Sequence, residues 1–202
     1  MLDLPIRKMI DPVLGRVAII LRDLGFSANA VTWLGFAIGL LGAACIALGW
    51  FGAALALVAV NRILDGLDGC IARLRGPTDL GGFLDIALDM IFYSSVPFAF
   101  ALLSEGNQLP AAFLIYSFIG TGSSFLAFAI VAAKQEGKLQ RSAHKSFFYS
   151  AGLIEGTETV IFLLLVCAFP NYFPVMAWVF GVLCWLTTVI RIVTAIFVFS
   201  EK

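Results

Sequence analysis

The sequence predicts an all-α integral membrane protein, and two observations support that fold class. Hydrophobic residues make up 61% of the 202 residues and charged residues only 13%, whereas soluble domains average about 45–50% apolar and about 25% charged residues. The apolar residues form long runs separated by short polar gaps, which is typical of a protein with several membrane helices. The formal net charge is zero, so no basic excess indicates a nucleic-acid partner.

Residues 1–25 are predicted to form an amphipathic helix at the membrane interface. At about 100° per residue, apolar side chains from Ile6 to Leu21 fall on one arc, and charged side chains such as Arg7 and Asp11 fill the remaining circumference. A helix of this kind lies in the interface with its apolar side towards the lipid. The same charges interrupt the apolar stretch that a cleavable signal peptide needs.

Six membrane spans are predicted to follow and to form one bundle over residues 29–199. Their approximate bounds are 29–49, 51–74, 81–103, 109–133, 149–169 and 173–199. We interpret the whole chain, residues 1–202, as a single membrane domain. The small residues of Gly120–Ser124 predict a close helix contact, and we expect a homodimer in which such a contact joins two subunits.

Lysine and arginine are unevenly distributed about these spans. The connections near residue 50, at 105–108 and at 170–172 contain neither residue type. The basic residues gather at the opposite ends of the spans: Arg7, Lys8, Arg16, Arg22, Arg73, Arg75, Lys134, Lys138, Arg141, Lys145 and Lys202. The positive-inside rule therefore places both termini in the cytoplasm, and we expect a protein of the bacterial inner membrane whose active site faces the cytoplasm.

Four aspartates at the cytoplasmic ends of the second and third spans mark the chemistry. Asp65 and Asp68 are three residues apart, and Asp85 and Asp89 are four apart, so each pair shares one helix face. The short connection makes the two helices antiparallel, which lets the acidic faces converge. Four adjacent carboxylates cannot all stay ionised without cations, and hard divalent ions prefer oxygen ligands. The cluster therefore predicts a site for two divalent cations, Mg²⁺ or Mn²⁺.

Three glycines and an arginine accompany the aspartates. Gly66 and Gly69 stand in a helix interior, where each costs about 0.5–1 kcal/mol relative to alanine, and Gly81 shares a face with the second aspartate pair. We interpret them as bare backbone that lets a bulky ligand approach the metals. Arg73, one turn beyond Gly69, can offer its planar fork to a phosphate.

The spacing D-x-x-D-G-x-x-A-R, seven residues, then G-x-x-x-D-x-x-x-D resembles the signature of the CDP-alcohol phosphatidyltransferase family. The resemblance implies an interfacial N-terminal helix, six spans and cytoplasmic termini. It also implies an activity, in which the hydroxyl of a small alcohol displaces CMP from a CDP-linked lipid. CDP-diacylglycerol is the expected donor lipid, and phospholipid biosynthesis is the expected role.

The resemblance implies roles for the four aspartates. Asp65, Asp68 and Asp85 would bind one metal ion, and Asp65, Asp85 and Asp89 would bind the second. Asp89 would also act as the general base that takes the proton of the acceptor hydroxyl. A nearby metal ion lowers the cost of deprotonating an alcohol with so weak a base.

The resemblance also implies contacts with the CDP-lipid. Gly69 and Arg73 would contact the cytidine and the diphosphate, and Thr78 occupies the loop position where the family places a hydroxyl on the nucleotide. Asn29 and Thr32 belong to the segment S-A-N-A-V-T, which is similar to the family's S/T-P-N-x-x-T at the start of the first span. Ala28 stands where the family usually has proline.

The acceptor alcohol is indicated by residues that disagree. Lys134 and Arg191 resemble basic positions of family members that use phosphorylated acceptors. Glu155 and Glu158 at the start of the fifth span would repel a second phosphate and suit a polyol or an amino-alcohol. The sequence thus favours an unphosphorylated acceptor, with glycerol 3-phosphate or an inositol phosphate as the alternative.

Blander interpretations compete with these. The aspartates could serve as ion-pair partners of nearby arginines, although ion pairing requires neither the glycines nor the spacing. For Arg62 a structural role is favoured, since a residue one turn before Asp65 can simply orient it. Acidic residues in membrane spans also mark cation transporters. In a transporter, however, the acidic residues would be expected near the midplane and without an arginine such as Arg73 beside them.

Overall fold

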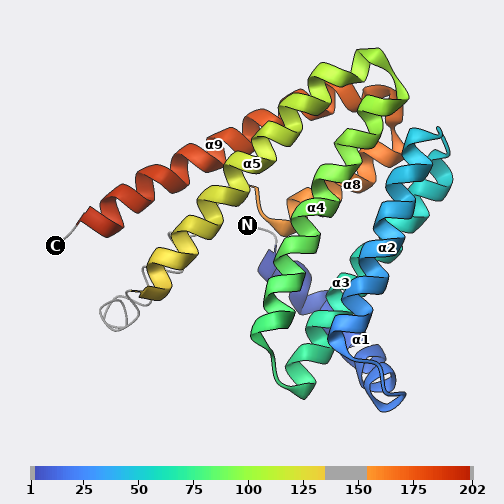
Figure 1. Cartoon of the computed structure of the whole chain (residues 1–202), viewed down its shortest axis with the longest axis vertical. Coiled ribbons are helices and arrows are strands. Elements are labelled where there is room, and N and C mark those ends of the chain that lie inside the picture. The colour runs from blue at the N-terminus through green and yellow to red at the C-terminus, as the bar shows by residue number, and fades with distance from the viewer. Residues whose placement is uncertain (1–2, 135–153, 201–202) are drawn as a thin grey trace.

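The computed structural model describes residues 3–134 and 154–200, and this part of the chain is helical without any strand (Figure 1). The helices are α1 (Asp3–Asp23), α2 (Ala28–Ala47), α3 (Phe51–Arg75), α4 (Asp79–Leu103), α5 (Glu105–Lys134), α8 (Gly156–Ala168), the short 3-10 helix η2 (Pro170–Tyr172) and α9 (Phe173–Ser200). The predicted all-α class is confirmed.

Four segments of the described chain are long and apolar enough to cross a membrane. They are Ala28–Ala47, Asp79–Leu103, Glu105–Lys134 and Pro170–Ser200. Helix α3 has 25 residues but is too charged to qualify, because Arg62, Asp65 and Asp68 interrupt its apolar run. Helix α8 matches the fifth predicted span with 13 residues, and 149–153 lie outside the described residues. Six spans and cytoplasmic termini therefore stay predictions.

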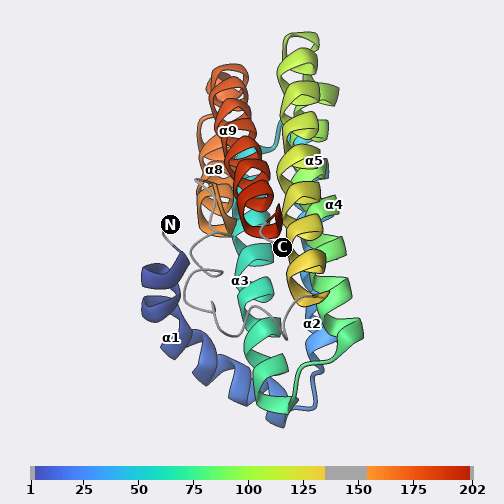
Figure 2. The same cartoon turned by 90° about the vertical axis from the view of Figure 1, so that its left-hand side faces the viewer.

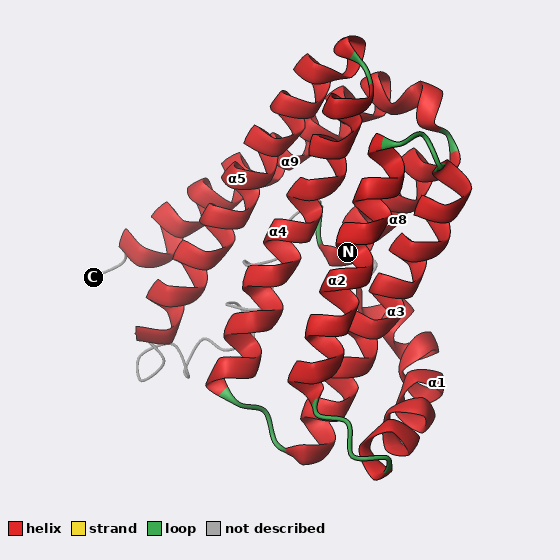
Figure 3. Ribbon diagram, turned by 45° about the vertical axis from the view of Figure 1, so that its right-hand side comes forward, coloured by secondary structure: helices red, strands yellow, loops and turns green. Residues whose placement is uncertain are grey.

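Side-chain caps and glycine turns gather three helix ends at one end of the molecule. The hydroxyl of Ser27 accepts a hydrogen bond from the Ala30 backbone N–H (3.2 Å) at the start of α2. The Thr78 hydroxyl accepts one from Gly81 N–H (3.1 Å) at the start of α4. Gly76, with φ of +95°, ends α3 in the conformation that favours glycine. Figure 3 shows the α1–α2 and α3–α4 connections side by side at this end.

The spacing Gly35-x-x-x-Gly39 lets α2 approach α3 and α4 closely. A Cβ on Gly39 would lie 2.7 Å from the Phe92 ring and 2.8 Å from Asn61 Nδ2. A Cβ on Gly35 would lie 3.2 Å from Cβ of Leu64. This close packing of small residues brings the middle of α3 against Phe92 of α4.

Helices α5 and α9 form a second pair that runs side by side away from α2 and α3 (Figure 1). A Cβ on Gly120 would lie 3.3 Å from the Trp185 ring and 3.4 Å from Thr188 Oγ1, both on α9. The small-residue stretch Gly120–Ser124 thus serves a contact within one chain, and the homodimer stays a prediction without support from this stretch.

Helix α1 lies across the end of α3, as Figure 2 shows. Leu14 and Ala18 pack against α3, where Ala18 is fully buried. Val13 and Ile20 remain 64% and 60% exposed. Since part of its apolar surface is left uncovered by protein, α1 has an apolar side to offer a membrane, and its place at the interface stays a prediction.

Candidate active site

The carboxylates of three aspartates meet where the end of α3 faces the start of α4. Asp65 and Asp68 lie on α3 and Asp85 on α4, and one oxygen of each lies within 4.8 Å of the others. The antiparallel packing of the two helices brings these faces together, as the spacing predicted. Asp68 is buried, Asp65 is half-buried and Asp85 is exposed, so the cluster opens to one side.

The three carboxylates fit a divalent cation. Oδ2 of Asp68 is buried and has no hydrogen-bond partner, although a buried carboxylate oxygen without a partner is costly. A small cavity of about 10 Å³ lies beside it, and all four aspartates line this cavity. Carboxylate oxygens are the ligands that Mg²⁺ and Mn²⁺ prefer. A bound cation would satisfy the orphaned oxygen.

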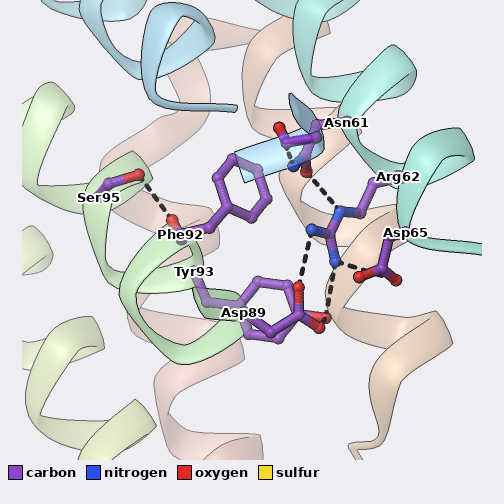
Figure 4. Close-up of polar contacts among 8 residues, drawn as sticks. Asn61, Arg62, Asp65, Asp89, Phe92, Tyr93 and Ser95 are labelled. Atoms are coloured by element: carbon purple, nitrogen blue, oxygen red, sulfur yellow. Dashed lines mark hydrogen bonds and ion pairs between the residues drawn. The ribbon is translucent and has the colours of Figure 1, made fainter. Parts of the chain in front are cut away.

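Asp89 stands apart from the other three carboxylates. Its Oδ1 lies 2.9 Å from Nη2 of Arg62, and its Oδ2 accepts a hydrogen bond from the Tyr93 hydroxyl at 2.9 Å (Figure 4). Among the described residues, only Asp65, Asp68 and Asp85 form a group of three carboxylates whose oxygens lie within 4.8 Å of one another. The second ligand set that the resemblance implied, with Asp89 in it, is therefore not assembled in this structure.

Arg62 pairs with two aspartates, the expected Asp65 and also Asp89. Its Nη1 lies 3.7 Å from Oδ2 of Asp65, and its Nη2 lies closer, at 2.9 Å, to Oδ1 of Asp89. The closer partner comes from α4, and helix spacing within α3 alone cannot indicate it. Tyr93, one turn after Asp89, was missed as well. The only sequence signal for Tyr93 was its position four residues after Asp89, which places both side chains on one helix face.

A larger pocket of about 310 Å³ adjoins the aspartates. It is lined by four of the five residues predicted to contact the CDP-lipid, namely Asn29, Thr32, Gly69 and Thr78, together with Asp68 and Asp85. The pocket and the carboxylate cluster therefore share two aspartates. A ligand that fills this pocket would place one end beside the cation site.

Gly81 is needed for the shape of this pocket. A Cβ at this position would lie 3.0 Å from Oγ1 of Thr78 and 3.3 Å from Oδ1 of Asn29. Both atoms belong to residues that line the pocket. The predicted bare backbone at Gly81 is thus present, and it brings together the starts of α2 and α4. At Gly69 an added Cβ would meet only Nη1 of Arg73, at 3.5 Å.

Arg73 is the predicted nucleotide contact that does not line the pocket. Its Nη2 donates to Sγ of Cys70 at 3.0 Å and lies 4.0 Å from Oδ1 of Asp11 in α1. The side chain is 58% exposed. Arg75, which the sequence analysis did not single out, lines the pocket instead and donates to the backbone oxygen of Arg22 at 3.0 Å.

Gly66 does not serve the site in the way the sequence suggested. A Cβ there would lie 2.7 Å from Cδ1 of Leu14. The bare backbone at Gly66 therefore admits a side chain of α1. Helix spacing placed the glycine next to an aspartate in sequence but could not show which neighbour it faces.

The candidate acceptor residues lie along α5, α8 and α9. Lys134 is the exposed last residue of α5. Arg191 is 6% exposed, and its Nη1 donates to the backbone oxygen of Thr121 (2.8 Å) and lies 3.2 Å from Oγ of Ser124. Its Nε is buried without a partner. Arg191 also lines a cavity of about 370 Å³ between α5 and α9.

Glu155 and Glu158 start α8. The Glu155 side chain accepts from the backbone N–H of Glu158, and Oε2 of Glu158 accepts from the backbone N–H of Glu155 at 3.1 Å. This reciprocal arrangement is a capping box, which satisfies two N–H groups at the helix start. The two glutamates therefore have a structural role that needs no acceptor.

The chain is similar to several characterised or solved proteins. It is 50% identical over 193 residues to inner membrane protein YnjF of Escherichia coli, covering 95% of this chain and 94% of that protein. It is 28% identical over 191 residues to archaetidylinositol phosphate synthase of Pyrococcus horikoshii, covering 94% of each.

The solved structures show the same fold. The crystal structure of Mycobacterium tuberculosis phosphatidylinositol phosphate synthase (PgsA1) with CDP-DAG bound superimposes with a TM-score of 0.65 at 24% identity, over 92% of this chain and 94% of that one. The same enzyme with manganese and citrate gives 0.65 at 22% identity, over 90% and 88%. The family model described as CDP-alcohol phosphatidyltransferase matches residues 26–193, and the chain therefore belongs to the CDP-alcohol phosphatidyltransferase family.

Proposed function

We propose that this protein transfers a phosphatidyl group from CDP-diacylglycerol to the hydroxyl of a small alcohol and releases CMP. The observation that carries the proposal is the sharing of Asp68 and Asp85 between the carboxylate cluster and the 310 Å³ pocket. A CDP-lipid whose cytidine fills that pocket would bring its diphosphate to the carboxylates. A family member crystallised with CDP-DAG bound has the same fold, which supports this donor.

Asp65, Asp68 and Asp85 would hold the divalent cation, and we expect two ions, Mg²⁺ or Mn²⁺, when the substrate is bound. Divalent cations neutralise the charge that develops on a transferring phosphoryl group and on its leaving group. A fold relative that was crystallised with manganese supports the use of such an ion.

Asp89 is proposed as the general base. It lies in the same small cavity as the three metal ligands, yet outside their cluster. Its carboxylate is held by Arg62 and Tyr93, so its position is fixed before an acceptor arrives. A base must be within hydrogen-bond reach of the proton that it takes, and a fixed carboxylate at the edge of the metal site meets that need.

The acceptor is proposed to carry a phosphate. Arg191 is a buried cation with an unpartnered Nε at the edge of a 370 Å³ cavity, and an anionic group would satisfy it. The capping box accounts for Glu155 and Glu158, on which the sequence preference for an unphosphorylated acceptor rested. The Pyrococcus relative is named archaetidylinositol phosphate synthase, which favours a phosphorylated polyol such as an inositol phosphate. Glycerol 3-phosphate belongs to the same class.

An unphosphorylated polyol or amino-alcohol is the second candidate, and one observation favours it. Glu155 is close enough for its charge to act on Arg191. A carboxylate there lowers the positive potential that a phosphate would meet, and it would accept hydrogen bonds from hydroxyl or ammonium groups.

The active site is proposed to face the cytoplasm of a bacterial inner membrane. Four helices of the described chain are long and apolar enough to span, and the relative at 50% identity is an inner membrane protein. The uneven lysine and arginine distribution supports the orientation.

An acceptor screen tests the proposal. Purified protein in detergent is given CDP-diacylglycerol, Mg²⁺ or Mn²⁺ and a panel of phosphorylated and unphosphorylated alcohols, and CMP release is measured. We expect metal-dependent CMP release with one acceptor class. CMP release that resists chelators would contradict the metal-dependent mechanism. Metal flux in vesicles without CMP release would support a cation transporter instead.

A further inference from the structure

Arg62 is anchored more firmly than a simple counter-ion requires. Its side chain is 7% exposed. Nε donates to Oδ1 of Asn61 at 2.6 Å, and Nδ2 of Asn61 donates to the backbone oxygen of Gly35 in α2 at 2.8 Å. The close approach of α2 at Gly35 and Gly39 therefore fixes Asn61, and Asn61 fixes the guanidinium. Figure 4 shows this chain of contacts.

The other end of the guanidinium is directed at α4. Nη1 donates to the Tyr93 hydroxyl at 3.0 Å, and Nη2 donates to Oδ1 of Asp89 at 2.9 Å. The Cζ atom lies 4.6 Å from the centre of the Phe92 ring. An arginine that stacks on an aromatic ring and forms hydrogen bonds from both ends of its guanidinium is held in one orientation. Lysine could not reproduce these contacts because it has no planar fork.

These contacts occupy both oxygens of Asp89. Oδ1 accepts from Arg62 and Oδ2 accepts from Tyr93. The guanidinium also lies 3.7 Å from Asp65. Two of the three residues that the family resemblance implies for a second cation thus already face a positive charge. A divalent ion that binds these carboxylates must therefore sit close to the guanidinium, and the two positive charges repel each other.

We propose that Arg62 is the positioning residue of Asp89 and the competitor of a second divalent cation. The first ion binds to Asp65, Asp68 and Asp85 while Asp89 stays on Arg62. A second ion binds beside the guanidinium and against its positive charge, so the two sites fill in sequence with unequal affinity. The inference rests on the proposed function for the role of Asp89, but ion binding is measured without turnover.

A Mn²⁺ titration of the purified protein without lipid substrate tests the proposal. Ion binding is monitored by calorimetry or by the loss of the spin resonance signal of free Mn²⁺. We expect one tightly bound ion per chain and a second that binds at least about tenfold more weakly. In Arg62→Gln the ratio between the two affinities should shrink by at least about tenfold, because the competing charge is gone. The exposed Arg16 of α1 provides the matched control, and Arg16→Gln should leave the ratio unchanged.

Two milder variants keep the test informative if Arg62→Gln folds poorly. Tyr93→Phe frees Oδ2 of Asp89 and should tighten the second ion by less than Arg62→Gln does. Arg62→Lys keeps the charge without the fork and should give an intermediate ratio. Two equal affinities in the wild-type protein would overturn the proposal, and so would an unchanged ratio in both Arg62→Gln and Tyr93→Phe.

Turnover provides the readout for positioning. Arg62→Gln should lower kcat and leave KM for CDP-diacylglycerol within about twofold, because the CDP-lipid pocket does not include Arg62. A raised KM with unchanged kcat would contradict the positioning role. If no acceptor supports CMP release but the Mn²⁺ ratios behave as expected, the proposed function fails and the competition between Arg62 and the second ion stands.

Discussion

Replacing Asp68 by asparagine should stabilise the protein without metal and destroy its response to metal. Oδ2 of Asp68 is buried and has no partner, and two other carboxylates have an oxygen within 4.8 Å. Asparagine has nearly the same shape, removes one negative charge from the cluster and supplies an N–H₂ donor that can reach a neighbouring carboxylate.

The size of the gain follows from the geometry. At the largest separation of 4.8 Å and an effective dielectric constant of about 20, each of the two like-charge pairs costs roughly 3.5 kcal/mol before screening. Arg62 and water reduce this repulsion, and an unsatisfied buried polar atom costs about 1–3 kcal/mol. We therefore expect Asp68→Asn to raise the free energy of unfolding by about 1–3 kcal/mol in the presence of a chelator.

Thermal unfolding in detergent, with chelator and then with excess Mn²⁺, measures both effects. A ligand at about 100 times its Kd adds about 2.7 kcal/mol of stability, so the wild-type protein should gain roughly that amount and Asp68→Asn should lose most of the gain. Asp79→Asn is the matched control, since Asp79 is an exposed aspartate at the start of α4 outside the cluster. The reasoning is refuted if Asp68→Asn melts below wild type in chelator, or if it keeps the full Mn²⁺ response.

Three further predictions concern catalysis and substrate binding. Asp89→Asn should retain CDP-lipid binding and lower turnover by roughly 10²–10⁴, measured as CMP release beside a CDP-lipid binding assay; near-normal turnover would place the base elsewhere. Gly81→Ala should weaken CDP-lipid binding about tenfold or more, because its Cβ would crowd Thr78. Gly52→Ala is the control and should bind normally, since Gly52 lies outside the pocket and its Cβ would meet nothing within 4 Å. Arg191→Ala should abolish use of a phosphorylated acceptor and spare CDP-lipid binding, as the acceptor screen would report. Full activity of Arg191→Ala with a phosphorylated acceptor would contradict the role of Arg191 and favour an unphosphorylated acceptor.

Helix periodicity predicted the centre of the site well. The three- and four-residue spacings of the aspartates required two acidic faces, and a short antiparallel connection left them one way to meet, so Asp65, Asp68 and Asp85 converge. Composition predicted the all-α class for the same kind of reason, because long apolar runs have few alternatives in a membrane.

Contacts between helices were harder to predict from periodicity. Arg62 was assigned to Asp65 on its own helix, but a residue of α4 is closer. Gly66 was assigned to the ligand and instead admits Leu14 of α1. In each case the spacing within one helix was correct and the neighbouring helix decided the contact.

The spacing of the two glutamates at the start of α8 fits two interpretations. Glu155 and Glu158 are three residues apart, and that spacing fits a capping box as well as a ligand-binding face. The distinction depends on where the helix begins, and in the described residues α8 begins at Gly156 with Glu155 as its N-cap.

The charges of α3 also bear on how the chain enters a membrane. Arg62, Asp65 and Asp68 lie in a helix that lacks an apolar window of its own, and each such residue opposes insertion of an isolated helix by about 2.5–3.5 kcal/mol. The partners that neutralise or hydrogen-bond this stretch belong to α2 and α4, through the backbone of Gly35 and the side chain of Asp89. If α3 is a span, as the sequence predicts, it has to enter the bilayer together with its neighbours, so the residues that equip the protein for chemistry would also dictate the order of its assembly.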